Sequence, residues 1–536
     1  MKSPRSTWFW NALLLALLVW QAAVLSLHIN RPWTGHHDWN GFLWSQAAHN
    51  HLLAGLRSTL GASAWNHFGP PPIPPEAYYV HHPPLLSLIL AALFAVLGEH
   101  EWVARLLPVS FSVVGAMLLW LLVREAAGPR AATLAVAVFA ACPTELYFGQ
   151  MVNFEPLMAV WMLGALWCLR RWQLTASSAY LAAALGLVAL GLWTEWPMYI
   201  LAVVLAAMLL ARRPPDWRAS GMLTAIALAS AMLFLLHIRL VCPDAWRDAL
   251  GQFAFRLSAD PGLTRESGAT FTAAEWFVRQ GRFLTRGILW PLWILAIAGA
   301  AMCWRKRLTS DGLRWLGWAA LNLFSMQTIY LVVWRNVSYT HEYASFYFVL
   351  PVAIMGGVAL DGLLGCVQQR WSSKRTHVVA HCLLVAAVVG LCGWGYAQSR
   401  VYHHRYYLLE WGEPEPEDLI PSLGRTIARA CPDDAMIICN FPWISPQLQY
   451  YARKEMAFQK TAYADWQPYL ATNRAIGGVI WQEAQGAAEL LAALPPGHRE
   501  IVRFGPYSFC LWRPESAGTG RSQARSRAAS ALSESK

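Results

Sequence analysis

Apolar residues along this chain gather in long runs that short polar segments separate. Eleven of these runs reach or approach the roughly 20 residues that a helix needs to cross a bilayer. They lie at about 8–27, 102–123, 131–148, 155–169, 178–193, 196–211, 222–240, 287–304, 315–334, 346–364 and 378–394. The first run follows two basic residues as a signal peptide does, but its length favours an uncleaved first helix. The pattern predicts a mainly α-helical bundle of about 11 transmembrane helices.

A shorter run at 83–97 opens on Pro83-Pro84 and is typical of an interfacial helix. If this run does not span, every dense cluster of Lys and Arg falls on one side of the membrane. The clusters are Lys2/Arg5, Arg124/Arg130, Arg170/Arg171, Arg212/Arg213/Arg218, Arg305/Lys306/Arg307 and Arg370/Lys374/Arg375. Because basic loops are retained in the cytoplasm, we expect the N-terminus inside and the C-terminal segment outside.

Most of the remaining length falls on the expected outer face. The transmembrane domain is expected over 1–398, with large outer loops at 28–101 and 239–286. Residues 399–514 are expected to form a small extracytoplasmic α/β domain. Within it, strand patterns lie at 435–438, 476–481 and 507–512, and helix patterns at 422–430 and 483–494. The tail at 515–536, rich in Ser, Ala and Arg, is expected to be disordered.

Composition agrees with a membrane protein. Of the 536 residues, 56% are hydrophobic and 14% are charged, against about 25% charged in an average soluble domain. These values exclude an ordinary soluble enzyme. The net charge of +11 lies largely in the inner loops, so it sets orientation and does not indicate a nucleic-acid partner. The ten cysteines have no zinc spacing, and a disulfide among Cys431, Cys439 and Cys510 stays open.

Four acidic residues lie at the expected outer membrane boundary: Asp38, Glu155, Glu195 and Glu342. Acids near spans are costly to hold there, so each is a functional candidate. Asp38 either caps the helix that follows it or acts as a general base. Glu155 and Glu195 either complement helix dipoles or form part of a site. A transporter more often has carboxylates near the membrane midplane, so this placement favours chemistry at the outer face.

Basic and aromatic residues accompany these acids. His81 and His82 precede the paired prolines, and they are either solvated loop residues or ligands of a divalent metal that other loops complete. The segment from Arg335 to Tyr343 includes His341 and Glu342 at the outer end of a span. Its cationic donors suit a phosphate group, although Arg and Tyr also form membrane-anchoring girdles.

Together these segments resemble the GT-C class of lipid-donor glycosyltransferases. The similarity is to the bacterial group related to protein O-mannosyltransferases and lipid A aminoarabinose transferases, which is glycosyltransferase family 39-like. The motifs that carry it occur in the family's order over roughly the first 365 residues. They are Asp38-Trp39-Asn40-Gly41, His81-His82-Pro83-Pro84-Leu85, Glu101-Trp102-Val103-Ala104-Arg105-Leu106, Asn153-Phe154-Glu155-Pro156 and His341-Glu342-Tyr343.

The resemblance implies roles for individual residues. Asp38 corresponds to the catalytic base, and Glu155 to the acid that shapes the site. A divalent metal, where one is present, would be held by Asp38, His82 and Glu155. Arg335 and His341 would contact the lipid phosphate. The other residues expected to bind substrate are His37, Asn40, His81, Glu195, Glu342 and Tyr343. Many relatives have Asp-Glu in the first loop where this chain has Asp38-Trp39, so the acceptor does not carry over.

The implied activity is inverting transfer of a sugar from a polyprenyl-phosphate carrier to a glycan, lipid or protein acceptor. It would take place on the outer face of a bacterial inner membrane. The absence of a Gly-rich nucleotide loop agrees with a lipid-linked donor. A multi-span transporter or lipid flippase of the envelope is the competing function. A non-catalytic membrane partner is a third possibility. An outer-boundary cavity that contains both Asp38 and Glu155 would separate the enzyme from both.

Overall fold

The chain groups into two compact units. The computed structural model describes residues 4–34, 37–211, 214–243, 245–259, 270–306, 309–370, 374–411, 418–439, 445–458, 476–482, 491–492, 494 and 497–514. The helical unit comprises Met1–Ile29, Val80–Leu93 and Trp102–Tyr406. The α/β unit comprises Asn30–Tyr79, Phe94–Glu101 and Tyr407–Lys536. Residues of the first expected outer loop therefore group with the C-terminal segment, and the units do not follow the expected division at 398.

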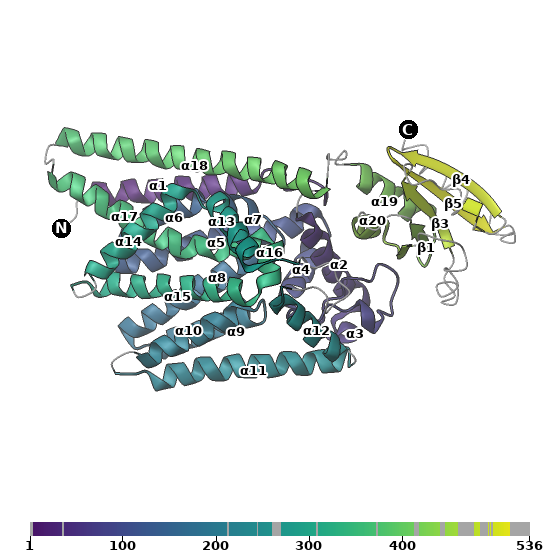
Figure 1. Ribbon diagram of the computed structural model, residues 1–536, viewed down its shortest axis with the longest axis horizontal. Helices are drawn as coiled ribbons and strands as arrows, with labels where there is room; N and C mark the ends of the chain where they lie inside the picture. The colour runs from purple at the N-terminus through teal and green to yellow at the C-terminus, as the bar shows by residue number, and fades with distance from the viewer. Residues whose placement is uncertain are drawn as a thin grey trace. The chain divides into compact units, whose positions relative to one another are not determined.

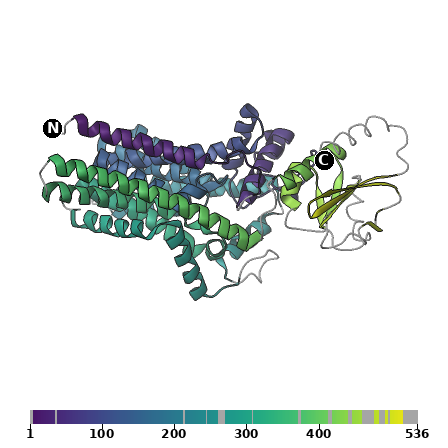
Figure 2. The same cartoon turned by 90° about the horizontal axis from the view of Figure 1, so that it is seen from above.

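The helical unit is a bundle of long helices, and Figures 1 and 2 show them running nearly parallel. Its elements are α1 (Pro4–Leu25), α4 (Leu85–Leu97), α5 (Glu101–Ala127), α6 (Pro129–Ala140), α7 (Pro143–Phe148), α8 (Phe154–Thr175), α9 (Ser178–Leu192), α10 (Pro197–Ala211), α11 (Trp217–Val241), α12 (Ala245–Leu257), α13 (Ala273–Gly287), α14 (Trp290–Lys306), α15 (Asp311–Val333), α16 (Arg335–Thr340), η3 (Glu342–Phe348), α17 (Val349–Arg370) and α18 (Lys374–Trp411). One end each of α4, α5 and α18 belongs to the α/β unit.

Ten of the eleven expected spans fall mainly on one helix of this unit, and the run at 131–148 is divided between α6 and α7. Among the described residues, six helices are long and apolar enough to cross a membrane. The number becomes seven if α13 and α14, which are bent by 93° at their junction, form one span. The chain is thus a multi-pass membrane protein, and the count of eleven spans stays a prediction. The expected interfacial run is the helix α4, whose 13 residues are too few to span.

One expected span is broken. The run at 131–148 was expected to be continuous, but α6 ends at Ala140 and α7 begins at Pro143. Proline has no N–H for the helix ladder and disfavours helical backbone in the residue before it, so a new helix starts there. The break places α7 beside η3 and α13, two elements of the same end of the bundle.

Small residues let the central helices of the bundle approach closely. The α17 helix packs against both α6 and α14. A Cβ at Gly357 would overlap the backbone of α6 at Ala131 and Ala135, and one at Gly299 would overlap the carbonyl oxygen of Met355. Close backbone approach through small residues is the usual way in which helices pack in membranes, where lipid offers no hydrophobic driving force.

The α/β unit contains one five-stranded sheet in the order β2-β1-β3-β5-β4. Its elements are α2 (Asp38–Ala54), α3 (Leu56–Thr59), η1 (Pro75–Ala77), α19 (Leu419–Ala430), β1 (Met436–Cys439), α20 (Ser445–Ala452), β2 (Met456–Phe458), β3 (Ile476–Gln482), β4 (Gly497–Phe504) and β5 (Tyr507–Pro514). β1 is parallel to β2 and β3, and β5 is antiparallel to β3 and β4. The three expected strands and the helix expected at 422–430 are present, whereas β2, β4 and α20 were not foreseen.

Two expectations for this unit fall mainly outside the described residues. They are the helix at 483–494 and the disordered tail at 515–536. On the question of a disulfide, none of the ten cysteines forms one in the structure. Cys431, Cys439 and Cys510 lie buried as thiols, and Cys439 and Cys510 belong to the interior of the sheet.

Polar contacts join the first expected outer loop to the region around α20. Tyr451 accepts from the backbone N–H of Trp33 over 2.8 Å, and Arg453 donates to Gln46 over 2.8 Å. Arg453 also forms an ion pair with Glu99, which accepts from His49 over 2.7 Å. Burial by itself would raise the pKa of Glu99, but the His49 hydrogen bond and the Arg453 charge lower it to about 2. This cluster fixes the loop within the unit.

Candidate functional site

A buried carboxylate, Glu195, lies at the corner between α9 and α10. α10 begins at Pro197, which suits a first helical position because its missing N–H would be unpaired there anyway. The Glu195 side chain accepts hydrogen bonds from Tyr347 of η3 over 2.6 Å and from Tyr330 of α15 over 3.1 Å. Burial raises the pKa of Glu195, and the two tyrosine hydroxyls act in the opposite direction. Three segments distant in sequence therefore converge on one carboxylate.

A second acid, Glu155, belongs to the same cluster. It stands in the first turn of α8 and is 2% exposed. Asn153 donates to its Oε1 over 3.3 Å, whereas its buried Oε2 has no hydrogen-bond partner among the described residues. The charge of Glu195 acts on Glu155 electrostatically, so the two carboxyls form a repelling pair in a region of low dielectric. A buried pair of this kind favours a ligand that carries positive charge or several hydroxyl donors.

Two basic residues complete this cluster. The guanidinium of Arg256, near the end of α12, lies 3.3 Å from Nε2 of His82, and its charge also acts on Glu195. Burial, Arg256 and His81 hold the pKa of His82 well below its usual value, so this imidazole is neutral. Its ring lies 4.7 Å from that of Phe154. The cluster of Glu155, Glu195, His82 and Arg256, with Tyr330 and Tyr347, is called the acidic-basic cluster below.

The other residues of the helical unit that were expected to bind substrate each make different contacts. The indole N–H of Trp196 donates to the carbonyl of His81 over 3.1 Å, which ties the two corners together. The ring of His341 stacks on that of Tyr343 with centroids 4.8 Å apart. Glu342 is buried, at 2% exposure. Arg335 is exposed and donates to the carbonyl of Leu257 over 3.4 Å, so it holds the end of α12 beside α16.

The expected residues of the first outer loop belong to the α/β unit. His37 is the N-cap of α2, and its side chain makes no capping hydrogen bond. Asp38 is the first helical residue and not the cap, so the capping alternative for Asp38 is wrong. The Asp38 carboxylate is 8% exposed and lies 3.5 Å from the guanidinium of Arg31. Asn40 follows in the first turn, where its backbone N–H bonds to the carbonyl of His37 over 3.1 Å.

The glycine of the Asp38-Trp39-Asn40-Gly41 motif has a packing role. A Cβ at Gly41 would overlap the indole ring of Trp33, which is 1% exposed. The indole therefore packs directly against the α2 backbone one turn after Asp38. Any larger residue at Gly41 would displace the indole.

The arrangement of the described side chains does not support a site for a divalent metal. Among the described residues, no group of three or more His, Cys, Asp and Glu side chains is arranged to hold a metal ion. Nε2 of His82 also faces the guanidinium of Arg256, a cation that disfavours a second cation beside it. The expected set of Asp38, His82 and Glu155 stays a prediction.

Sequence reasoning missed three members of the acidic-basic cluster. Tyr330 and Tyr347 lie within apolar runs, where a tyrosine is indistinguishable from ordinary interfacial packing. Arg256 is one of several arginines in the second expected outer loop, and nothing in the local sequence distinguishes it from the others. A further buried acid, Glu145 of α7, was also missed; it accepts from Gln21 over 2.8 Å and serves packing between α1 and α7.

Comparisons with known proteins agree with this architecture. The family model of dolichyl-phosphate-mannose-protein mannosyltransferase matches residues 81–239, a stretch that includes His82, Glu155 and Glu195. The fold is that of the GT-C class, as the sequence motifs predicted. No curated protein sequence matches the chain.

Several solved structures share the fold. ArnT from Cupriavidus metallidurans bound to undecaprenyl phosphate is similar with a TM-score of 0.63 and 14% identity, over 95% of this chain and 99% of that one. Oligosaccharyltransferase AglB from Archaeoglobus fulgidus, with an inhibitory peptide and a dolichol-phosphate, gives 0.55 and 13% over 96% and 76%. An oligosaccharyltransferase from Archaeoglobus fulgidus in complex with Zn and sulfate gives 0.53 and 15% over 87% and 68%.

Proposed function

We propose that this protein is an integral membrane glycosyltransferase that moves a sugar from a polyprenyl-phosphate carrier to an acceptor on the outer face of a bacterial inner membrane. The observation that carries the proposal is the acidic-basic cluster, which presents two buried carboxyls, a guanidinium and a neutral imidazole in a GT-C fold. The matched family model and the lipid phosphates named for the similar structures support the donor class.

The basic half of the cluster suits the phosphate of the carrier. As the bond between the anomeric carbon and the phosphate oxygen breaks, its electron pair moves to that oxygen and the carrier leaves with additional negative charge. Arg256 and neutral His82 are donors that would stabilise this charge, and a guanidinium is the preferred partner of phosphate oxygens. Arg335 and His341 are proposed to contact the same phosphate from α16 and η3.

The acidic half suits the sugar. Positive charge develops on the ring as the leaving group departs, and the carboxylate of Glu195 would stabilise it, with Glu155 beside it. The unpartnered Oε2 of Glu155 is an acceptor for a sugar hydroxyl. Tyr330 and Tyr347 hold Glu195 by two hydrogen bonds and favour its ionised form.

Asp38 is proposed as the general base. Its carboxylate would take the proton of the acceptor hydroxyl while the acceptor oxygen attacks the anomeric carbon opposite the phosphate, which inverts the configuration. The guanidinium of Arg31 lies 3.5 Å from this carboxylate and would hold it in place. A divalent metal, if one is bound, would add Lewis-acid stabilisation of the leaving phosphate; the steps above require only residues of this chain.

The test is transfer by the purified protein in detergent, with polyprenyl-phosphate sugars extracted from bacterial membranes as donors and the glycans, lipids and proteins of the same membranes as acceptors. We expect free polyprenyl phosphate to accumulate, and Glu155→Gln to slow its release by at least tenfold. The matched control is Glu125→Gln. Glu125 forms an ion pair with Arg171, which stands at the opposite end of α8 from Glu155. Equal loss in both variants, or no loss in Glu155→Gln, would refute the role of the cluster.

A further inference from the structure

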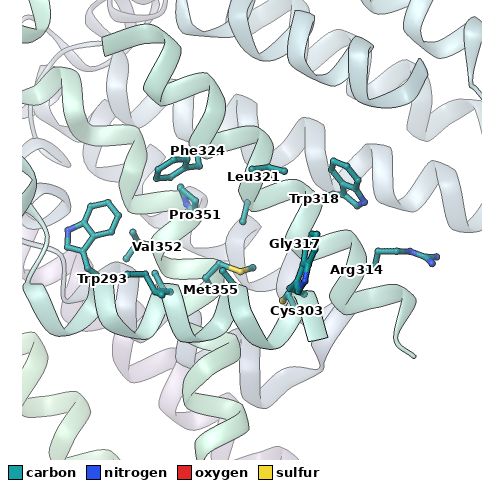
Figure 3. Close-up of a pocket in the computed structure, with 15 residues that line it drawn as sticks. Trp293, Cys303, Arg314, Gly317, Trp318, Leu321, Phe324, Pro351, Val352 and Met355 are labelled. Atoms are coloured by element: carbon teal, nitrogen blue, oxygen red, sulfur yellow. The ribbon is translucent and has the colours of Figure 1, made fainter. Parts of the chain in front are cut away.

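An apolar groove crosses the surface of the helical unit between α14, α15 and α17. Figure 3 shows Trp293 at one end and Arg314 at the other, with Leu321, Phe324 and Met355 between them. Its volume of about 590 Å³ is in the range of ligand pockets. Leu321 and Phe324 are 52% and 43% exposed, so the groove is open along its length.

The Arg314 end of the groove is strongly basic. Arg314 lines this end from the first turns of α15, and α14 ends nearby with Arg305 and Lys306 in its last turn. Asp311 partly offsets them, because it pairs with Arg314 and with Arg170. Trp304 and Trp318 flank the same end and are 67% and 47% exposed, as is typical of side chains at the level of lipid headgroups.

The dimensions of the groove match one leaflet of a bilayer. Trp293 and Trp304 lie 11 residues apart on α14, which corresponds to about 16 Å along a helix. The hydrocarbon core of a bilayer is roughly 30 Å thick, so the groove accommodates the acyl chain of one leaflet.

The groove is distinct from the acidic-basic cluster. Arg314 and Tyr330 lie 16 residues apart on the continuous helix α15, or about 24 Å along its axis. The basic end of the groove and the hydroxyl of Tyr330 that binds Glu195 therefore lie toward opposite ends of α15, a helix long enough to cross a membrane. A headgroup at Arg314 belongs to a lipid of the leaflet opposite the proposed sugar donor.

We propose that this groove binds one acyl chain of an anionic phospholipid, with the lipid phosphate at Arg314 beside the basic last turn of α14. Basic residues beside membrane helices attract anionic headgroups. The bound lipid would fill the exposed apolar channel between α14 and α15 and so stabilise this pair of helices.

The proposal is tested by native mass spectrometry of the purified full-length protein in detergent, titrated with phosphatidylglycerol, phosphatidylcholine or undecaprenyl phosphate. Ala300→Phe fills the groove from α14, and Ala298→Phe is its control, since Ala298 is exposed on the same helix but does not line the groove. We expect phosphatidylglycerol to bind in preference to phosphatidylcholine. Ala300→Phe should lose at least tenfold in phosphatidylglycerol affinity, while Ala298→Phe keeps the affinity of the wild type.

A second pair of variants tests the headgroup contact. Arg314→Gln should weaken phosphatidylglycerol about fivefold, the factor that one basic residue supplies near a membrane surface, and Arg314→Lys should restore most of it. Arg218→Gln, at an exposed arginine of α11, should change nothing. Equal binding of the two phospholipids, or equal effects of Ala300→Phe and Ala298→Phe, would overturn the proposal. Loss of undecaprenyl phosphate binding in Ala300→Phe would assign the groove to the carrier and would also overturn it.

Discussion

The hydroxyl of Tyr347 provides the sharpest test of how the acidic-basic cluster works. Tyr347→Phe removes a hydrogen bond of 2.6 Å to a carboxylate that is 4% exposed, and water cannot readily replace it. A hydrogen bond to a buried charged group is worth about 1.5–3 kcal/mol. If the ionised carboxylate of Glu195 acts in the transition state, the transfer rate should fall roughly 10- to 150-fold.

The same variant has a predicted pH signature. The Tyr347 hydroxyl opposes the upward effect of burial on the pKa of Glu195, so its removal raises that pKa further. A larger fraction of Glu195 is then protonated at low pH. The acid limb of the rate profile should move to higher pH, and the defect of Tyr347→Phe should shrink as the pH increases.

Tyr199→Phe is the matched control for this experiment. Tyr199 lies on α10, and its buried hydroxyl has no hydrogen-bond partner among the described residues. Transfer should be assayed for both variants from pH 5 to 9, with thermal unfolding measured in parallel. A rate loss in Tyr347→Phe that is independent of pH, or that Tyr199→Phe reproduces, would refute the reasoning.

Three further outcomes are expected. Arg256→Gln should slow release of the carrier phosphate at least tenfold, and Arg256→Lys should recover part of it, as measured by the rate of polyprenyl phosphate formation. Gly41→Ala should destabilise the α/β unit by about 1–3 kcal/mol in urea unfolding, because the added methyl displaces the Trp33 indole. The pKa of about 2 for Glu99, against 4.5 unperturbed, corresponds to about 3 kcal/mol of stability. This stability is present above pH 4.5, is lost as the pH falls toward 2, and should be absent in Glu99→Gln when protease resistance is followed against pH.

The sequence predicted the helices well because apolar runs of spanning length leave few alternatives. It was wrong at 131–148, where Pro143 splits a run whose composition is uniformly apolar. In the sheet, β4 was missed because its side chains alternate only partly between buried and exposed positions. Pairing with β5 determines that strand, and pairing partners are not visible in a local pattern.

The candidate site could be predicted only in part, for a related reason. Glu155 and Glu195 could be identified because acids at the ends of apolar runs are costly and rare. Tyr330, Tyr347 and Arg256 gain their roles from α15, η3 and α12 converging on Glu195, and each is unremarkable within its own segment. A single residue that is ordinary locally becomes functional through tertiary contact.

The most direct test of the proposed function is donor cleavage by the purified protein, with Asp38→Asn beside the wild type. Extracted polyprenyl-phosphate sugars serve as donors and the glycans, lipids and proteins of the same membranes as acceptors, and mass spectrometry follows both the free carrier phosphate and the glycosylated acceptor. The wild type should release polyprenyl phosphate and form an equal amount of product with inverted configuration. Asp38→Asn should insert normally into the membrane and form no product. Movement of intact donor lipid across the bilayer without cleavage, or full activity of Asp38→Asn, would contradict the account.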